Sequence, residues 1–233
     1  MGHRSWSKGF TKETHPSVRK ISDTMKRKNI DNFAGWRREA MRKGVIRTKF
    51  SAFKRSGDLA ELIGVVLGDG HIAAFPRTER LLIFSNSNNT GFVTRYTELV
   101  QKFFEKEPYV YKISGSNCIR ISLYQKHISE RLGIPSGARK HARLVVPTWI
   151  LRNKEFIKRY LRGLYEAEGS HSIHLPTYTY KFSFSNSNQS LLKNVVKLLK
   201  VLGLSPHFDS LRVQISKKNE VERAVELLQF RKY

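Results

Sequence analysis

Two short segments of the chain, residues 62–70 and 161–169, are mostly apolar and end in an acidic residue followed by glycine. The two acids are Asp69 and Glu168. If both segments are helices that end side by side, the negative end of each helix dipole and the neighbouring carboxylate disfavour both charges. A divalent cation such as Mg²⁺ relieves this, because it takes oxygen ligands and often only one or two carboxylates from a protein. Asp69 and Glu168 are therefore candidate metal ligands.

The same two segments carry small residues four positions apart. These are Gly64 and Gly68 in the first copy, and Gly163 and Ala167 in the second. Residues at i and i+4 share one helix face, and a face of small residues lets another backbone approach closely. The spacing predicts two helices packed on each other, with the backbone carbonyls of Gly68 and Ala167 close to the metal. The alternative is that each acid ends an amphipathic helix in a solvated turn, and the second copy favours the paired site.

Both segments resemble the signature of the LAGLIDADG homing endonucleases, and two copies in one chain resemble the monomeric, pseudo-symmetric type. The resemblance covers residues 57–233. It implies that each motif is a helix at the interface of two halves and that its terminal acid binds the catalytic metal. The first copy has Leu67 at the first acidic position of the motif, whereas the second copy has an acid there, Glu166. The resemblance further implies Mg²⁺ or Mn²⁺ as cofactor, Ca²⁺ as a non-cleaving substitute, and cleavage of both strands of a long DNA target with short 3′ overhangs.

A second repeat lies beside the motifs. The sequence Phe-Ser-Asn-Ser-Asn occurs at residues 84–88 and again at 184–188. In the second copy, strict alternation places Tyr178, Tyr180, Phe182 and Phe184 on one strand face, which is expected to meet helices. The other face is polar, with Thr179, Lys181, Ser183 and Ser185, as expected of a sheet that lies in a DNA groove or faces solvent.

A further hairpin follows in each half, at residues 119–123 and 211–215, with apolar residues alternating with polar ones. Arg and Gln side chains suit the edges of guanine and adenine. The predicted DNA-contacting residues are Ser85, Arg120, Ser122, Arg139, Arg143, Thr179, Lys181, Ser183, Arg212 and Gln214. The order helix, hairpin, helix, hairpin, helix predicts an α+β fold of two αββαββα halves, each with a four-stranded antiparallel sheet, which together form a DNA-binding saddle.

Three further side chains are candidate cap or catalytic residues. Asn88 and Asn188 are expected to cap the helices at 90–104 and 190–202, as Asp58 is for the first motif helix. In the resembled family a polar residue near this asparagine position also lies by the active centre. The family also carries a lysine in a loop comparable to the basic connection 133–143, where it helps to stabilise charge at the scissile phosphate. Lys140 is the candidate for that role, and a simple phosphate contact is the alternative.

Residues 1–56 form a basic extension, since residues 1–55 hold 16 Lys and Arg against 4 acids. One helix is expected to begin at Thr14 or Ser17 and another to cover residues 33–41. The extension is either a solvated tail or an arm that orders on DNA. The expected half-domains are residues 57–146 and 147–233.

The whole chain of 233 residues has a formal net charge of +24, which indicates a polyanionic partner and nucleic acid first. No run of 18 apolar residues exists, and Cys118 is the single cysteine, so a disulfide within the chain and a cysteine-rich zinc site are excluded. We expect a soluble, intracellular, non-secreted monomer that acts on double-stranded DNA and makes no membrane contact. Two alternatives are an RNA maturase that binds its own intron RNA, and a DNA-binding relative that has lost cleavage.

Overall fold

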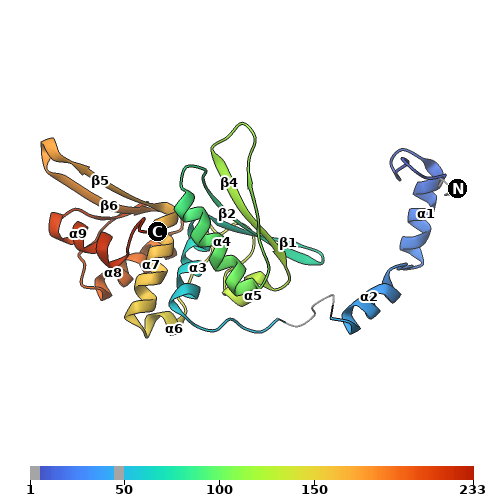
Figure 1. Cartoon of the computed structure of the whole chain (residues 1–233), viewed down its shortest axis with the longest axis horizontal. Helices are drawn as coiled ribbons and strands as arrows, with labels where there is room; N and C mark the ends of the chain where they lie inside the picture. The colour runs from blue at the N-terminus through green and yellow to red at the C-terminus, as the bar shows by residue number, and fades with distance from the viewer. Residues whose placement is uncertain (1–5, 45–49) are drawn as a thin grey trace. The chain divides into compact units, whose positions relative to one another are not determined.

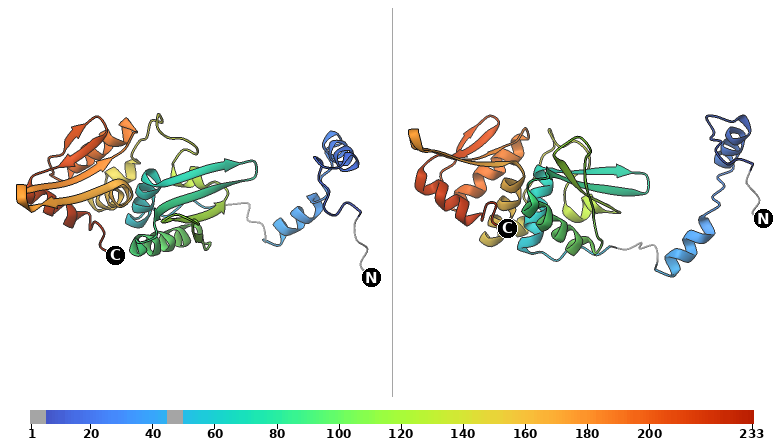
Figure 2. Two further views of the ribbon diagram at one scale, coloured as in Figure 1. Left: turned by 90° about the horizontal axis from the view of Figure 1, so that it is seen from above. Right: turned by 45° about the horizontal axis from the view of Figure 1, so that its top comes forward.

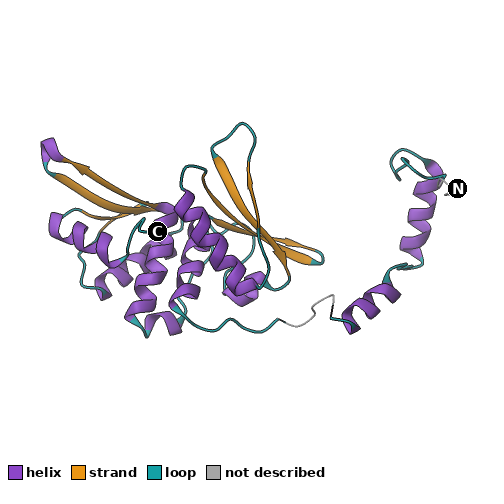
Figure 3. Ribbon diagram, viewed as in Figure 1, coloured by secondary structure: helices purple, strands orange, loops and turns teal. Residues whose placement is uncertain are grey.

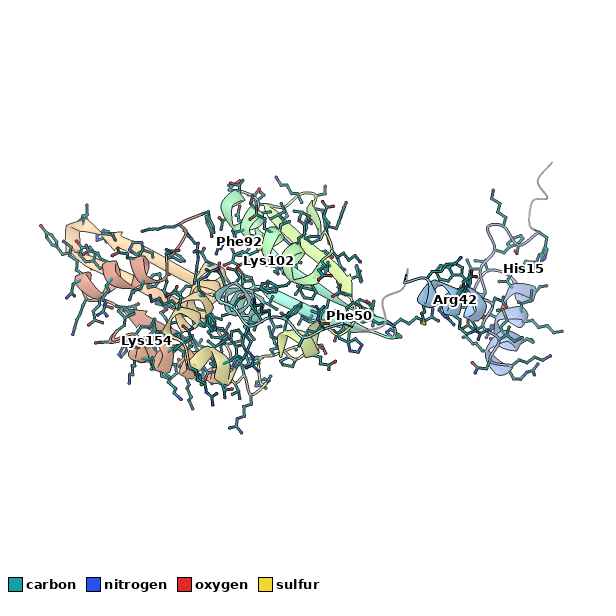
Figure 4. All side chains as sticks on the ribbon, turned by 60° about the horizontal axis from the view of Figure 1, so that its bottom comes forward. His15, Arg42, Phe50, Phe92, Lys102 and Lys154 are labelled. Atoms are coloured by element: carbon teal, nitrogen blue, oxygen red, sulfur yellow. The ribbon has the colours of Figure 1, made fainter. Side chains whose placement is uncertain are left out.

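The computed structural model describes residues 6–44 and 50–233, and the chain divides into two compact units, Met1–Phe50 and Ser51–Tyr233. In the first unit, α1 covers Pro16–Arg27 and α2 covers Ala34–Arg42. His15 is the N-cap of α1, because its side chain accepts a hydrogen bond from the Ser17 amide; the predicted caps Thr14 and Ser17 are wrong (Figure 4). The rings of Trp6 and Phe10 lie against His15, with ring centroids 5.9 and 4.6 Å from it. That the extension is a DNA-binding arm stays a prediction.

The second unit repeats one order of elements (Figure 1). Its first half consists of α3 (Gly57–Gly68), β1 (Gly70–Phe75), β2 (Thr78–Asn86), α4 (Thr90–Phe104), β3 (Tyr109–Lys112), β4 (Cys118–Gln125) and α5 (Ile128–Leu132). After α6 (Thr148–Leu151), its second half consists of α7 (Lys154–Glu168), β5 (Gly169–His174), a 3-10 turn (Leu175–Thr177), β6 (Thr179–Ser185), α8 (Gln189–Val201), β7 (His207–Asp209), β8 (Arg212–Ile215) and α9 (Lys218–Leu227). Both sheets are antiparallel, with strand orders β1-β2-β4-β3 and β5-β6-β8-β7. The predicted α+β fold is confirmed.

Helices α3 and α7 lie side by side between the two sheets (Figure 2). The two helices can approach this closely because glycines, which have no side chain, lie at the contact. A Cβ atom added to Gly64 would lie 3.0 Å from the Leu164 nitrogen, and one added to Gly163 would lie 2.7 Å from the Val65 nitrogen. Real Cβ contacts are longer, so the two backbones touch as the small-residue spacing predicts.

Each sheet packs one face against helices, and its other face carries no helix within the described ranges (Figure 3). The packed faces contribute core residues Leu81, Ile83, Ile121 and Leu123 in the first sheet and Phe182, Phe184, Val213 and Ile215 in the second. Tyr178 is a correction to the predicted alternation. It lies in the hairpin turn with φ of 47° and is 81% exposed, because the strand begins only at Thr179.

The two copies of Phe-Ser-Asn-Ser-Asn occupy different positions in their sheets. Gly70 pairs with Ile83, whereas Gly169 pairs with Phe184, so the second hairpin is two residues longer. Phe84 thus lies one residue beyond the strand position that corresponds to Phe184, and a one-residue shift reverses the face. Phe184 is buried under helices, but Phe84 lies on the open face opposite Arg120, whose guanidinium is 5.4 Å from the ring centroid. Ser85, expected on the open face, alternates instead with Phe84 and falls on the helix side.

The helix caps also differ between the halves. Asn188 caps α8, since its Oδ1 accepts the Leu191 amide at 2.9 Å, as predicted. In the first half the cap of α4 is Asn89 rather than Asn88. Ser56, not Asp58, caps α3.

A network of charges around the buried Glu61 joins the halves. Glu61 of α3 has no exposed surface, and its carboxylate accepts hydrogen bonds from Arg95 of α4 and Arg159 of α7. The carboxylate of Asp58 accepts hydrogen bonds from the guanidinium of Arg159 and, at 2.5 Å, from the ammonium of Lys102. Arg159 thus links the second half to two acids of the first. Over residues 6–44 and 50–233, no helix combines the length and apolar character that crossing a membrane requires.

Candidate active site

The two motif acids lie at neighbouring helix ends. Asp69 follows the last residue of α3, and its amide donates to the Val65 carbonyl at 3.1 Å. Its own carbonyl accepts the amide of Phe84 at 3.2 Å, which ties the acid to β2. Glu168 is the last residue of α7, and a Cβ added to Gly68 would lie 3.3 Å from its Cγ atom. The packing of α3 on α7 therefore brings the acids together.

Both carboxyls are poorly placed to carry negative charge. Burial and, to a smaller extent, the negative charge of Glu168 together raise the pKa of Asp69 to about 7. Burial also raises the pKa of Glu168, while a hydrogen bond from the Asn186 amide at 3.0 Å lowers it. The pair is therefore an electrostatically unfavourable arrangement that a cation would relieve.

The donor set fits a hard divalent cation. Among the described residues, no group of three or more His, Cys, Asp and Glu side chains could hold a metal. The candidate donors at the two helix ends are the carboxylates of Asp69 and Glu168 and the nearby backbone carbonyls. Mg²⁺ is commonly held in this way, with water and substrate phosphate oxygens completing its shell. The buried, mutually repelling acids match that requirement, and the carbonyls of Gly68 and Ala167 stay candidate ligands.

A cavity of about 220 Å³ opens beside Glu168. Gly68 and His71 of the first half line it, together with Lys140 of the connection and Asn186 of the second half. Lys140 is exposed, so the structure brings the candidate phosphate-stabilising lysine and one acid to the same cavity. Its catalytic role stays a prediction.

The two candidate asparagines have unlike surroundings. Asn88 is exposed, and its main-chain N–H donates to Oδ1 of Asn86 at 2.9 Å. Asn188 is buried and donates from Nδ2 to the carbonyls of Arg139 (2.6 Å) and Ala142 (2.8 Å), so it fixes the connection between the halves. The asparagine that bonds a motif acid is Asn186, which sequence reasoning missed although it belongs to the repeated Phe-Ser-Asn-Ser-Asn.

In the first half, the candidate DNA-contacting residues are engaged with neighbours. Arg120 donates to the Tyr111 hydroxyl at 3.1 Å. Ser122 is 5% exposed and accepts a hydrogen bond from Arg80 Nε at 3.1 Å. Arg80 and Tyr111 are thus open-face residues that the alternation of the sequence did not single out.

In the second half and the connection, the candidates are more accessible. Lys181, Arg212 and Arg143 are exposed. Gln214 donates a hydrogen bond to Ser216, and the hydroxyl of Thr179 bonds that of Thr177. Ser183 is buried, and its hydroxyl bonds that of Ser170. Arg139 differs from all of them, because its guanidinium donates to backbone carbonyls of the first half.

Residues 155–228 match the family model of the LAGLIDADG-like domain. This part of the chain is thus similar to a LAGLIDADG-like domain. No curated protein sequence matches the chain. Among solved structures, the chain is similar to I-DmoI in complex with DNA and Mn and to a point variant of I-DmoI in complex with its target DNA in the presence of Mg; for each, identity is 17%, TM-score is 0.50, and the match covers 74% of this chain and 96% of the other.

The full-length DUF199/WhiA protein from Thermatoga maritima is also similar, with 16% identity, a TM-score of 0.55, and coverage of 79% of this chain and 58% of that one. At these identities the likeness concerns the fold. The two-half LAGLIDADG architecture predicted from the sequence is confirmed, and the function of the site has to be argued from its residues.

Proposed function

We propose that this protein is a site-specific DNA endonuclease that uses a divalent metal to hydrolyse phosphodiester bonds in both strands of a long target, leaving short 3′ overhangs. One observation carries the proposal. Two partly buried acids lie together at the ends of packed helices, between two sheets that each leave one face open.

Asp69 and Glu168 would hold the metal, with the carbonyls of Gly68 and Ala167 beside them. A cation held by these groups would supply an acidified water and would stabilise the oxygens of an in-line displacement at phosphorus. Asn186 orients the Glu168 carboxylate through the 3.0 Å hydrogen bond from its side-chain amide. Lys140, at the same cavity, is suited to a phosphate oxygen. We propose Mg²⁺ or Mn²⁺ as cofactor and Ca²⁺ as a substitute that permits binding without cleavage.

We propose duplex DNA as the substrate because the protein is strongly positively charged and DNA is a polyanion. The net charge of +24 greatly exceeds what a fold requires, and Lys181 and Arg212 lie exposed on the open face of the second sheet. Both acids come from one chain, so a monomer contains the complete acid pair. I-DmoI, which has the same fold, was studied with DNA and Mn, which makes this substrate and cofactor the first to test.

The test is cleavage of a randomised duplex library with Mg²⁺. We expect cutting by the wild type, with no detectable cutting by Asp69→Asn or Glu168→Gln. Affinity of both variants for the selected duplex in Ca²⁺ should stay close to that of the wild type, because neither acid attracts phosphate. Cleavage by either variant at the wild-type rate would contradict the proposal.

A second candidate is a DNA-binding protein that does not cut. The fold match with DUF199/WhiA, whose name states no nuclease activity, favours it, whereas the presence of both Asp69 and Glu168 argues against it. Selective binding of a duplex by the wild type, without nicking in Mg²⁺ or Mn²⁺, would decide for this candidate.

A further inference from the structure

Arg139 lies in the connection between the halves, and its side chain reaches the end of α3. Its Nη2 donates to the carbonyl of Val66 at 2.8 Å and to the carbonyl of Gly70. These two carbonyls flank Asp69 in the chain. A guanidinium at this place also offsets the negative end of the α3 dipole, which otherwise opposes the charge on Asp69.

The backbone that carries Arg139 is anchored to both halves. The Gly137 amide donates to the Ile72 carbonyl of β1 at 2.8 Å. On the other side, Asn188 holds the Arg139 carbonyl from the start of α8. Arg139 therefore approaches α3 from a fixed position and not from a free loop.

This placement is costly for the fold. Arg139 Nη1 is buried and has no hydrogen-bond partner among the described residues, and an unmet buried donor destabilises a protein. Burial also lowers the pKa of the guanidinium. Water or a neutral side chain would satisfy the carbonyls at a helix end at lower cost. Because the Arg139 guanidinium destabilises the fold at this position, its presence indicates a functional role at Asp69.

The end of α7 is built differently. There the Gly169 amide bonds the Tyr165 carbonyl, and Asn186 holds the carboxylate of Glu168 directly. Within the described part of the chain, no lysine or arginine side chain donates to the carbonyls of the last turn of α7. The halves thus support their acids by different means, through the backbone for Asp69 and through the side chain for Glu168.

We propose that Arg139 is a positioning residue of the metal site: by holding the carbonyls of Val66 and Gly70, it fixes the turn that presents Asp69 and the Gly68 carbonyl to the cation. This inference rests on the proposed metal-dependent function. It replaces the direct DNA contact expected for Arg139 with a role that acts through Asp69.

The test compares Arg139→Met and Arg139→Lys with Arg131→Met in the full chain. Arg131 of the first half is a matched control, since it too is half-buried and donates to a backbone carbonyl, that of Ser51. Binding of Mn²⁺ is measured by electron paramagnetic resonance, with and without duplex DNA. The Mg²⁺ concentration for half-maximal cleavage and the thermal midpoint are measured beside it.

We expect Arg139→Met to weaken Mn²⁺ binding and raise the required Mg²⁺ concentration by about 10-fold or more, as for other residues that orient metal ligands. Excess Mg²⁺ should restore most of the rate, and Arg139→Lys, which keeps the charge, should lie between the wild type and Arg139→Met. Arg131→Met should lower only the thermal midpoint. Mn²⁺ binding by Arg139→Met that equals that of the wild type, or falls no further than that of Arg131→Met, would overturn the inference.

Failure of the proposed function gives a different result. If the wild type binds Mn²⁺ but cuts no duplex, the proposed endonuclease function is wrong. The comparison of Mn²⁺ binding between the wild type and Arg139→Met still tests the role of Arg139. If the wild type binds no Mn²⁺ under either condition, both proposals are wrong.

Discussion

The carboxyl of Asp69 holds its proton unusually tightly, because burial and the charge of Glu168 raise its pKa from 3.8 to about 7. Between about pH 4 and 7 the folded, metal-free protein therefore binds a proton that the unfolded chain has released. Folding stability falls with rising pH wherever the native state binds more protons. At about 1.4 kcal/mol per pKa unit, the loss amounts to at most about 4 kcal/mol at pH 7.

Asp69→Asn should remove that dependence. Urea unfolding in chelator is the measurement, at pH values from 4.5 to 7.5. We expect the free energy of unfolding of the wild type to fall across this range relative to that of the variant, and a divalent cation to restore it at neutral pH by binding the ionised acid. Parallel pH profiles for the two proteins would show that Asp69 titrates normally.

At the scale of helices, the α3–α7 contact leaves no room for side chains at its centre. Gly163→Ala should destabilise the protein by about 1–3 kcal/mol, because a methyl 2.7 Å from the Val65 nitrogen forces the helices apart. The shift also separates Asp69 from Glu168, so metal affinity should fall. Gly35→Ala is the control, since that position in α2 has nothing within 4 Å of an added Cβ, and it should leave the thermal midpoint unchanged or higher. Equal midpoints for the two variants would argue against the tight contact.

The charge network around Glu61 joins the same helices. Glu61→Gln leaves Arg95 and Arg159 without their common carboxylate in a buried site, and loss of one partner in such a site costs about 3–5 kcal/mol. Glu155→Gln removes the exposed pair with Lys158 and should cost less than about 1 kcal/mol. Chemical unfolding of the two variants at one pH measures the difference, and a cost for Glu61→Gln as small as that for Glu155→Gln would mean that solvent screens the network.

Element order and the helix contact were predictable because each follows from local physics. Glycines four apart on an apolar helix have a steric consequence wherever the helix packs, and alternation assigned Phe182 and Phe184 to the core. Positions that depend on register were not predictable. The likeness of the two five-residue copies led to Ser85 on the wrong face, because Phe84 lies one residue beyond the partner of Gly70 whereas Phe184 is itself the partner of Gly169, and a one-residue shift reverses the face. It also led to Asn88 as a cap, whereas Asn89 caps α4.

Site residues divide in the same way. Asp69 and Glu168 end their helices, so their meeting follows from the helix contact. Asn186 and Arg139 act through hydrogen bonds between segments far apart in sequence, 18 residues for Asn186 and Glu168 and 73 for Arg139 and Val66. No periodicity or motif spacing encodes such a contact, and only the folded chain shows it.

For the whole molecule, the effect of the net charge of +24 on DNA affinity depends on which basic side chains contact phosphates. A protein that neutralises DNA phosphates releases counterions, so the logarithm of affinity falls with the logarithm of salt concentration by about 0.9 per contact. Lys181 and Arg212 lie on the open face of the second sheet, whereas Lys154 and Lys158 lie on the first turns of α7, at the end remote from Glu168.

Lys181→Gln with Arg212→Gln should therefore reduce the salt slope for duplex binding by about 2, while Lys154→Gln with Lys158→Gln leaves it nearly unchanged. Both double variants remove the same charge, so long-range attraction falls equally and only direct contacts separate them. Fluorescence anisotropy between about 50 and 300 mM salt, in Ca²⁺, is the measurement. Equal slopes for the two variants would mean that DNA meets a general basic surface and not the open faces of the sheets, and the acids at the ends of α3 and α7 would then have no bound phosphate to act on.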